Sequence, residues 1–178
     1  RWNDDAPDKL CKRIPKSMRK LYLNAFQSKL FNDVLRSRQE QEILNTCLAG
    51  DLVWAHVGKG SAFKLHKEEL ASDEFVERMR ACRVSPTGPL FGAKMRQPSG
   101  RPFEIEQCIL ADSGVTNEHL ANAKQIISGS RRPLRVPVAQ PTLTSGVDEL
   151  GDFIRLQFEL PAGSYATVLI DELLTVSF

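Results

Sequence analysis

The segment that most constrains the fold is a long run whose apolar residues recur at the period of an α-helix, from Lys16 to about Gln39. The apolar stripe is formed by Met18, Tyr22, Phe26, Leu30, Phe31, Val34 and Leu35. Spacings of three and four residues place these side chains on one face of a helix. Pro15 stands at the entrance, where a residue without an N–H is tolerated. Because the apolar arc is broad, we expect this helix to lie at the centre of its domain.

Short strands and short helices are predicted after this helix. The runs "LVWAHV" and "AFKLH" are rich in β-forming residues and flank Gly58-Lys59-Gly60, which predicts a hairpin. Three helices are expected at about Asp73–Cys82, Pro102–Ala111 and Thr116–Lys124. Their start signals are Ser72 or Asp73 as an N-cap, Pro102 at a first helical position, and Thr116 as an N-cap. Glu104 and Glu106 are expected to complement the positive end of the second of these helices.

Proline and glycine interrupt the remaining segments. The stretch "SPTGPLFG" contains two prolines and two glycines and is interpreted as a turn. "RRPLRVPV" is expected to be extended, and "AQPTLTSGVDELGD" to be a linker or loop. The alternation in "FIRLQFEL" predicts a half-buried strand. After it, residues 161–164 should turn the chain into a helix from Tyr165 to Leu174.

Charge is unevenly distributed along the chain. The formal net charge is only +2, but residues 139–178 hold one arginine and six acidic residues, a net charge of −5. The first 138 residues therefore carry a net charge of +7. A basic body joined to an acidic end indicates two structural units, and a basic surface suits a polyanion such as RNA. The alternative is an ordinary solvated face of lysines and arginines.

Motifs of catalysis, metal binding and membrane insertion are missing from the sequence. The four cysteines, Cys11, Cys47, Cys82 and Cys108, are widely spaced, so we expect reduced thiols and no metal or disulfide framework. His56 and His66 fall on the two predicted hairpin strands, where we expect surface or paired histidines and no metal site. Neither a phosphate-binding glycine loop nor a nucleophile elbow is present. The apolar runs are too short to span a membrane, and no secretory signal is visible.

Four stretches, in order, carry a resemblance to a known family. "LYLNAFQSKLFNDVLRSR", "SPTGPLFG", "RRPLRVPV" and "LPAGSYATVLIDELL" resemble the conserved helix, Thr-Gly-Pro loop, return strand and C-terminal signature of the TruD family of RNA pseudouridine synthases. The matches span nearly the whole chain. One departure is local, because Asp171 stands where many members have arginine. That departure puts in doubt any phosphate contact or salt bridge from this position.

The resemblance implies an α+β fold with two parts. Residues 1–138 would form the TRUD insertion domain, a basic unit of mixed helices and short antiparallel strands. Residues 139–178 would supply the last strand, turn and helix of the pseudouridine synthase catalytic domain. The family's nucleophilic aspartate lies in a Gly-x-Lys-Asp-x-x-Ala motif, and this sequence contains no Lys-Asp step. Together with a start at Arg1, this leads us to expect a C-terminal part that is inactive alone, with no catalytic residue in the chain.

The resemblance also assigns candidate RNA-binding residues. Tyr165 corresponds to a Phe or Tyr that stacks on the target base. Gly163 would let RNA approach closely, and Ser164 would cap the last helix with its hydroxyl. Arg131 and Arg132 are expected either to bind phosphate or to form ion pairs within the fold.

The function that the resemblance implies is isomerisation of uridine to pseudouridine in tRNA, with uridine 13 as the family's substrate position. No cofactor and no metal are expected, the partner is tRNA or another structured RNA, and the location is cytoplasmic. The orphaned C-terminal strand provides a route to self-association. Two alternatives remain open: a non-catalytic RNA-binding module with a TruD-like fold, and an interaction domain whose basic face meets an acidic partner.

Overall fold

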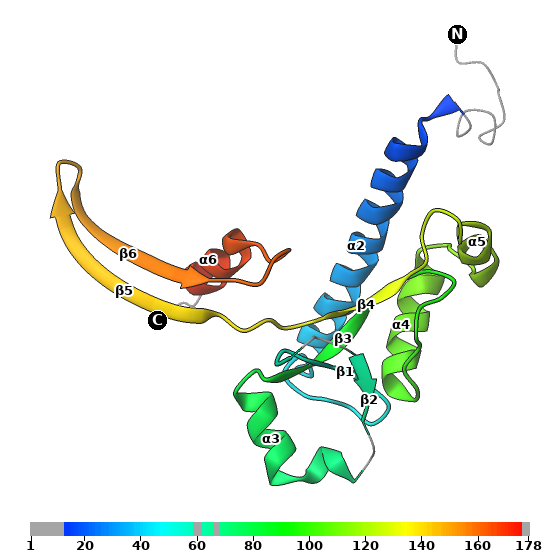
Figure 1. Cartoon of the computed structure of the whole chain (residues 1–178), viewed down its shortest axis with the longest axis horizontal. Helices are drawn as coiled ribbons and strands as arrows, with labels where there is room; N and C mark the ends of the chain where they lie inside the picture. The colour runs from blue at the N-terminus through cyan, green and yellow to red at the C-terminus, as the bar shows by residue number, and fades with distance from the viewer. Residues whose placement is uncertain (1–12, 59–61, 66–67, 176–178) are drawn as a thin grey trace. The chain divides into compact units, whose positions relative to one another are not determined.

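The computed structural model describes residues 13–58, 62–65 and 68–175 and divides the chain into two units, Arg1–Leu134 and Arg135–Phe178 (Figure 1). The first unit contains the elements α2 (Lys16–Glu40), β1 (Leu52–Ala55), β2 (Ala62–Lys64), the short 3₁₀ helix η1 (Glu69–Ala71), α3 (Asp73–Arg80), β3 (Val84–Leu90), α4 (Arg101–Asp112), α5 (Asn117–Asn122) and β4 (Ser130–Pro133). The second contains β5 (Ala139–Asp148), β6 (Gly151–Glu159) and α6 (Ala166–Thr175). Mixed helices and short antiparallel strands make this an α+β fold.

The sheet of the first unit has the order β2-β1-β3-β4, and every neighbouring pair is antiparallel. The predicted hairpin is confirmed by the pairing of Val53 with Phe63, while its turn at residues 59–61 lies outside the described residues. The predicted turn "SPTGPLFG" is wrong, because most of it forms the inner strand β3. The Thr87 hydroxyl donates to the Leu52 carbonyl oxygen at 2.7 Å, beside a proline that has no N–H to donate to the ladder.

Glycine within β3 is explained by the helix that covers it. A Cβ added at Gly88 would lie 2.8 Å from the Phe31 ring of α2 and 2.8 Å from the Leu134 side chain. The helix and the sheet therefore approach more closely than any side chain at this position would allow. The prolines and glycines of this segment are typical of a turn. The segment is a strand because it pairs with β1 and β4 and packs under Phe31.

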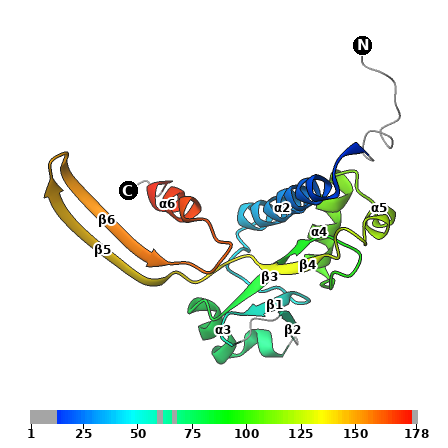
Figure 2. The same cartoon turned by 45° about the horizontal axis from the view of Figure 1, so that its top comes forward.

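Helix α2 packs against β3 and α4 with its C-terminal half (Figure 2). Its buried residues are Gln27, Leu30, Phe31, Val34 and Arg38. Met18 and Tyr22, which begin the apolar stripe, are exposed in the first unit. The predicted helix is therefore confirmed in extent, but only its second half is central to the core.

Among the described residues of the first unit, buried apolar side chains of the core gather in two clusters. One, between β1, β3 and α3, consists of Cys47, Val53, Leu65, Phe75, Met79 and Val84. The other, between α2 and α4, is centred on Leu30, Phe91 and Leu110. The predicted caps are confirmed: the Ser72 hydroxyl accepts from the Phe75 N–H, and the Thr116 hydroxyl accepts from the His119 N–H.

The second unit is a long hairpin followed by a helix. The predicted linker "AQPTLTSGVDELGD" is wrong, because most of it is β5, which pairs with β6 from Ala139↔Glu159 to Asp148↔Gly151. Its proline falls at a bulge between Ala139 and Thr142, where the ladder tolerates a missing N–H. Within the described residues, no helix is both long and apolar enough to cross a membrane.

Apolar side chains of the second unit are largely left in solvent. The predicted half-buried residues of β6, Phe153, Leu156 and Phe158, are partly covered. Besides Tyr165, the large exposed apolar residues described in this unit are Val138, Leu143, Val147, Leu150, Ile154, Val168, Ile170, Leu173 and Leu174. Such a surface is more apolar than an isolated unit of this size normally presents to water.

Candidate nucleic-acid interface

The turn between β6 and α6 holds three of the residues predicted to contact RNA. Its backbone is closed by a hydrogen bond from the Ser164 N–H to the Pro161 carbonyl oxygen, at 3.1 Å. Gly163 has a φ of +86°, in the left-handed region that side chains disfavour. A Cβ added there would meet nothing within 4 Å. The glycine is therefore required for the backbone conformation, and the space beside it is open.

Tyr165 projects from this turn into solvent and is 70% exposed. The sequence predicted Tyr165 as the first residue of the last helix. Helix α6 begins at Ala166, so Tyr165 directly precedes it. A displacement of one residue lies within the usual uncertainty of helix ends. The capping role predicted for Ser164 stays a prediction. The ring is available to a planar ligand.

Arg131, in contrast, is part of the core. Its guanidinium donates to both carboxylate oxygens of Glu106, at 2.8 and 2.7 Å, and to the Thr87 hydroxyl and carbonyl oxygen, at 3.0 and 2.7 Å. The side chains of Arg131 and Glu106 are each 3% exposed. Of the two roles left open by the sequence, the structure therefore shows the internal ion pair, and a phosphate has no access to this guanidinium.

Burial also affects the acid of this pair. Desolvation raises the pKa of the Glu106 carboxyl above its ordinary value, and the hydrogen bond and positive charge of Arg131 oppose this effect. The predicted role of Glu106 at the helix dipole is wrong, since only Glu104 lies in the first turn of α4. The buried residues Pro102, Glu106 and Leu110 are four apart. That spacing is the sequence signal that would have placed Glu106 in the core.

Arg132 points to the other face of β4, as neighbouring residues of a strand do. Its guanidinium carbon lies 5.2 Å from the centroid of the Phe31 ring on α2, a cation–π contact. Arg131 and Arg132 are adjacent in sequence but are not brought together at one site. Both belong to the first unit, whereas the turn with Tyr165 belongs to the second.

A second buried ion pair was not anticipated from the sequence. Arg38 of α2 donates to both carboxylate oxygens of Asp51, at 2.9 and 2.7 Å. The two side chains are 2% and 0% exposed. Asp51 also accepts from the Leu48 N–H at 2.8 Å, so it fixes the loop after α2. This pair is structural, since no solvent reaches it.

The histidines and cysteines form no centre in the part of the chain that the structure describes. The His56 Nε2 lies 2.9 Å from the Ser85 hydroxyl, and its predicted neighbour His66 is outside the described residues. Cys82 and Cys108 are free thiols, the buried Cys47 Sγ lies 3.5 Å from the Met79 Sδ, and Cys11 is not described. No group of three or more metal-ligating side chains occurs among the described residues.

Comparison with known proteins gives consistent matches. The family model for tRNA pseudouridine synthase D (TruD) matches residues 3–173. A tRNA pseudouridine synthase D of Geobacter sulfurreducens is 40% identical over 161 residues, covering 88% of this chain and 36% of the relative. That of Thermus thermophilus is 33% identical over 160 residues, covering 89% of this chain and 41% of the relative.

A solved structure agrees with the sequence relatives. The crystal structure assigned to tRNA pseudouridine synthase D from Methanosarcina mazei has a TM-score of 0.74 and 29% identity, and it covers 93% of this chain and 40% of its own. The chain thus spans well under half the length of the proteins that it matches. The resemblance inferred from the four sequence stretches is confirmed, and this chain belongs to the tRNA pseudouridine synthase D (TruD) family.

Proposed function

We propose that this chain is part of an RNA pseudouridine synthase that isomerises uridine to pseudouridine in tRNA, at the family's position, uridine 13. The observation that carries the proposal is the exposed ring of Tyr165 at the turn before α6. To react, the uracil must leave the RNA stack, which costs a few kcal/mol. Stacking on an aromatic ring recovers about 1–3 kcal/mol per base. Tyr165 would supply that contact.

The turn around Tyr165 supports a nucleotide in two further ways. Open space beside Gly163 leaves room for RNA backbone or base. The first N–H groups of α6 have no carbonyl partner within the helix, so this end favours an anion such as phosphate. Ser164 would contribute its hydroxyl to the same ligand. Arg132 is proposed as a further contact from the first unit, on its partly exposed side.

The bond-breaking chemistry is proposed to come from outside this chain. In the family it depends on an aspartate that follows a lysine, and the sequence contains no Lys-Asp step. This chain would then bind RNA and present the stacking ring, with no cofactor or metal. When separated from the rest of the enzyme, its unpaired strand edges would favour self-association.

The test uses the full-length protein that contains this chain. Pseudouridine in a tRNA transcript is measured after reaction with wild type, Tyr165→Ala and Tyr165→Phe. Loss of 1–3 kcal/mol of stacking should slow the alanine variant by about 5- to 150-fold, while phenylalanine keeps most of the rate. Because the ring is exposed, neither change should lower the melting temperature.

Two results would count against the proposal. An alanine variant as fast as wild type would remove the stacking role of Tyr165. A full-length wild-type protein that binds tRNA but forms no pseudouridine would favour the binding module instead.

A further inference from the structure

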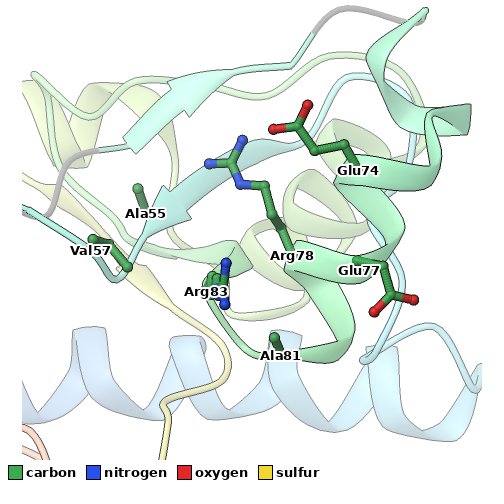
Figure 3. Close-up of a pocket in the computed structure, with 7 residues that line it drawn as sticks. All are labelled: Ala55, Val57, Glu74, Glu77, Arg78, Ala81 and Arg83. Carbon is green, nitrogen blue, oxygen red and sulfur yellow. The ribbon is translucent and has the colours of Figure 1, made fainter.

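A cavity of about 480 Å³ lies beside α3, at the end of β1, within the first unit (Figure 3). Its lining consists of Ala55, Val57, Glu74, Glu77, Arg78, Ala81 and Arg83. None of the four sequence stretches that resemble the TruD family contains these residues. The cavity is therefore a feature that the turn at Tyr165 does not explain.

Two guanidinium groups face this cavity without a counterion. Arg78 extends from α3 across the hollow (Figure 3), and Arg83, in the connection to β3, also lines it. In the described part of the chain, neither guanidinium has a carboxylate oxygen within 4 Å. Two positive charges that line one hollow attract an anion, even though water partly screens them because Arg78 is half-buried and Arg83 is exposed. The planar guanidinium fork also matches the geometry of phosphate oxygens.

The acidic side chains of the cavity do not neutralise this pair. Glu77 is turned away from the hollow and forms an ion pair with Arg80, at 3.0 Å (Figure 3). Glu74 also lines the cavity, with its carboxylate on the side of the Arg78 guanidinium (Figure 3), and it forms no ion pair within 4 Å among the described residues, so it would repel an anion. The net charge offered to a ligand is therefore positive, with Glu74 as the opposing group.

The backbone at the end of α3 brings the two arginines together. The Arg83 N–H donates to the Arg78 carbonyl oxygen at 2.9 Å, and the Cys82 N–H donates to the Met79 carbonyl oxygen at 3.1 Å. Cys82 has a φ of +50°, so a non-glycine residue occupies the left-handed position of a Schellman-type helix end. This turn reverses the chain within one residue. It holds the backbone of Arg83 against the last turn of α3, so that both arginines line the same cavity.

We propose that Arg78 and Arg83 clamp a phosphodiester group of bound RNA, so that this cavity is a second RNA contact, remote in sequence from Tyr165. The proposal rests on the RNA-binding function proposed above. The apolar side chains of Ala55, Val57 and Ala81 would border the ribose. The clamp binds RNA without reading its sequence, since phosphate contacts position a nucleic acid and do not identify its bases.

The experiment measures the dissociation constant of a fluorescently labelled tRNA transcript for the 178-residue chain at a series of KCl concentrations. Arg78→Ala and Arg83→Ala should each raise the dissociation constant by about fivefold to tenfold. Each should also reduce the slope of the logarithm of affinity against the logarithm of KCl concentration by about one. Arg80→Ala is the matched control. It removes the same charge two residues along the same helix, from a side chain paired with Glu77, and should change affinity less than twofold.

Two further variants sharpen the test. Glu74→Gln should tighten tRNA binding by about twofold, because it removes the opposing charge without adding a cation. Arg78→Lys keeps the charge but loses the bidentate fork, so an affinity between wild type and Arg78→Ala is expected. The lysine variant keeps the test valid if truncation to alanine impairs folding, which circular dichroism detects.

The outcomes separate this inference from the proposed function. If Arg78→Ala and Arg83→Ala behave like Arg80→Ala, the phosphate clamp is wrong, while isomerisation and its dependence on Tyr165 stand. If the clamp variants lose affinity but Tyr165→Ala isomerises tRNA normally, the stacking role fails and the clamp stands. A wild-type chain with no affinity for tRNA would overturn the clamp, and the RNA-binding part of the proposed function with it.

Discussion

Removing Arg131 should destabilise the first unit far more than removing any exposed arginine. Arg131→Met fills most of the same volume but leaves the Glu106 carboxylate buried, at 3% exposure, without its bidentate partner. Breaking a buried ion pair from one side costs about 3–5 kcal/mol. With an unfolding entropy of about 2.1 cal/mol/K for each of about 134 residues, the melting temperature should fall by about 10–18 °C.

Differential scanning calorimetry of the whole chain measures this loss, with Arg80→Met as the control. The Arg80–Glu77 pair is 75% and 69% exposed, so its removal should cost less than about 1 kcal/mol. The double variant Arg131→Met/Glu106→Gln should recover much of the loss, because no charge is then left buried. Equal destabilisation by Arg131→Met and Arg80→Met would refute the reasoning.

The same pair sets a pH dependence with a definite sign. The pKa of Glu106 is raised in the folded protein above its ordinary value of 4.5. Between pH 4.5 and the higher pKa of the folded state, the folded protein binds more protons than the unfolded chain. The contribution of Glu106 to the free energy of unfolding is therefore fully present below pH 4.5. It is lost as pH rises through the folded pKa. Without Arg131 the folded pKa rises further, so the stability gap between wild type and Arg131→Met should widen from pH 4.5 upward. A gap that narrows with rising pH would contradict this sign.

Two backbone substitutions test other features of the first unit. Gly88→Ala places a methyl group 2.8 Å from the Phe31 ring and should cost about 1–3 kcal/mol in a denaturant titration; an unchanged midpoint would contradict the close packing of α2 on β3. Cys82→Gly relieves the left-handed backbone at the end of α3 and should raise stability by up to about 1 kcal/mol, with tRNA affinity unchanged; destabilisation would show that the thiol contributes more than the backbone strain costs.

Local signals predicted local structure well. The caps at Ser72 and Thr116 and the extent of α2 follow from side chains within a few residues of each other. β3 and β5 were missed because their composition is typical of turns and linkers. They are strands because of their partners: β3 lies between β1 and β4 beneath Phe31, and β5 pairs along most of β6.

The candidate site was predictable where one short motif carries it. The turn from Gly163 to Tyr165 is contiguous, so its residues and their order were readable, with an error of one residue at the helix start. Whether Arg131 binds phosphate or forms an internal ion pair depends on Glu106, which lies 25 residues away in sequence, and only the fold shows that the two side chains are in contact. Arg78 and Arg83 resemble any solvated arginines in sequence, because their position on one cavity depends on the backbone turn at Cys82.

The β5–β6 hairpin has a consequence for how this chain behaves as a sample. A two-stranded hairpin by itself is only marginally stable in water, and the large apolar side chains described in this hairpin and in α6 are mostly exposed. Amide protons there should exchange with deuterium sooner than those of β1 and β3, since local opening is easiest where few apolar contacts are broken. A protease added in trace amounts would accordingly cut the second unit first and leave the first as the resistant fragment.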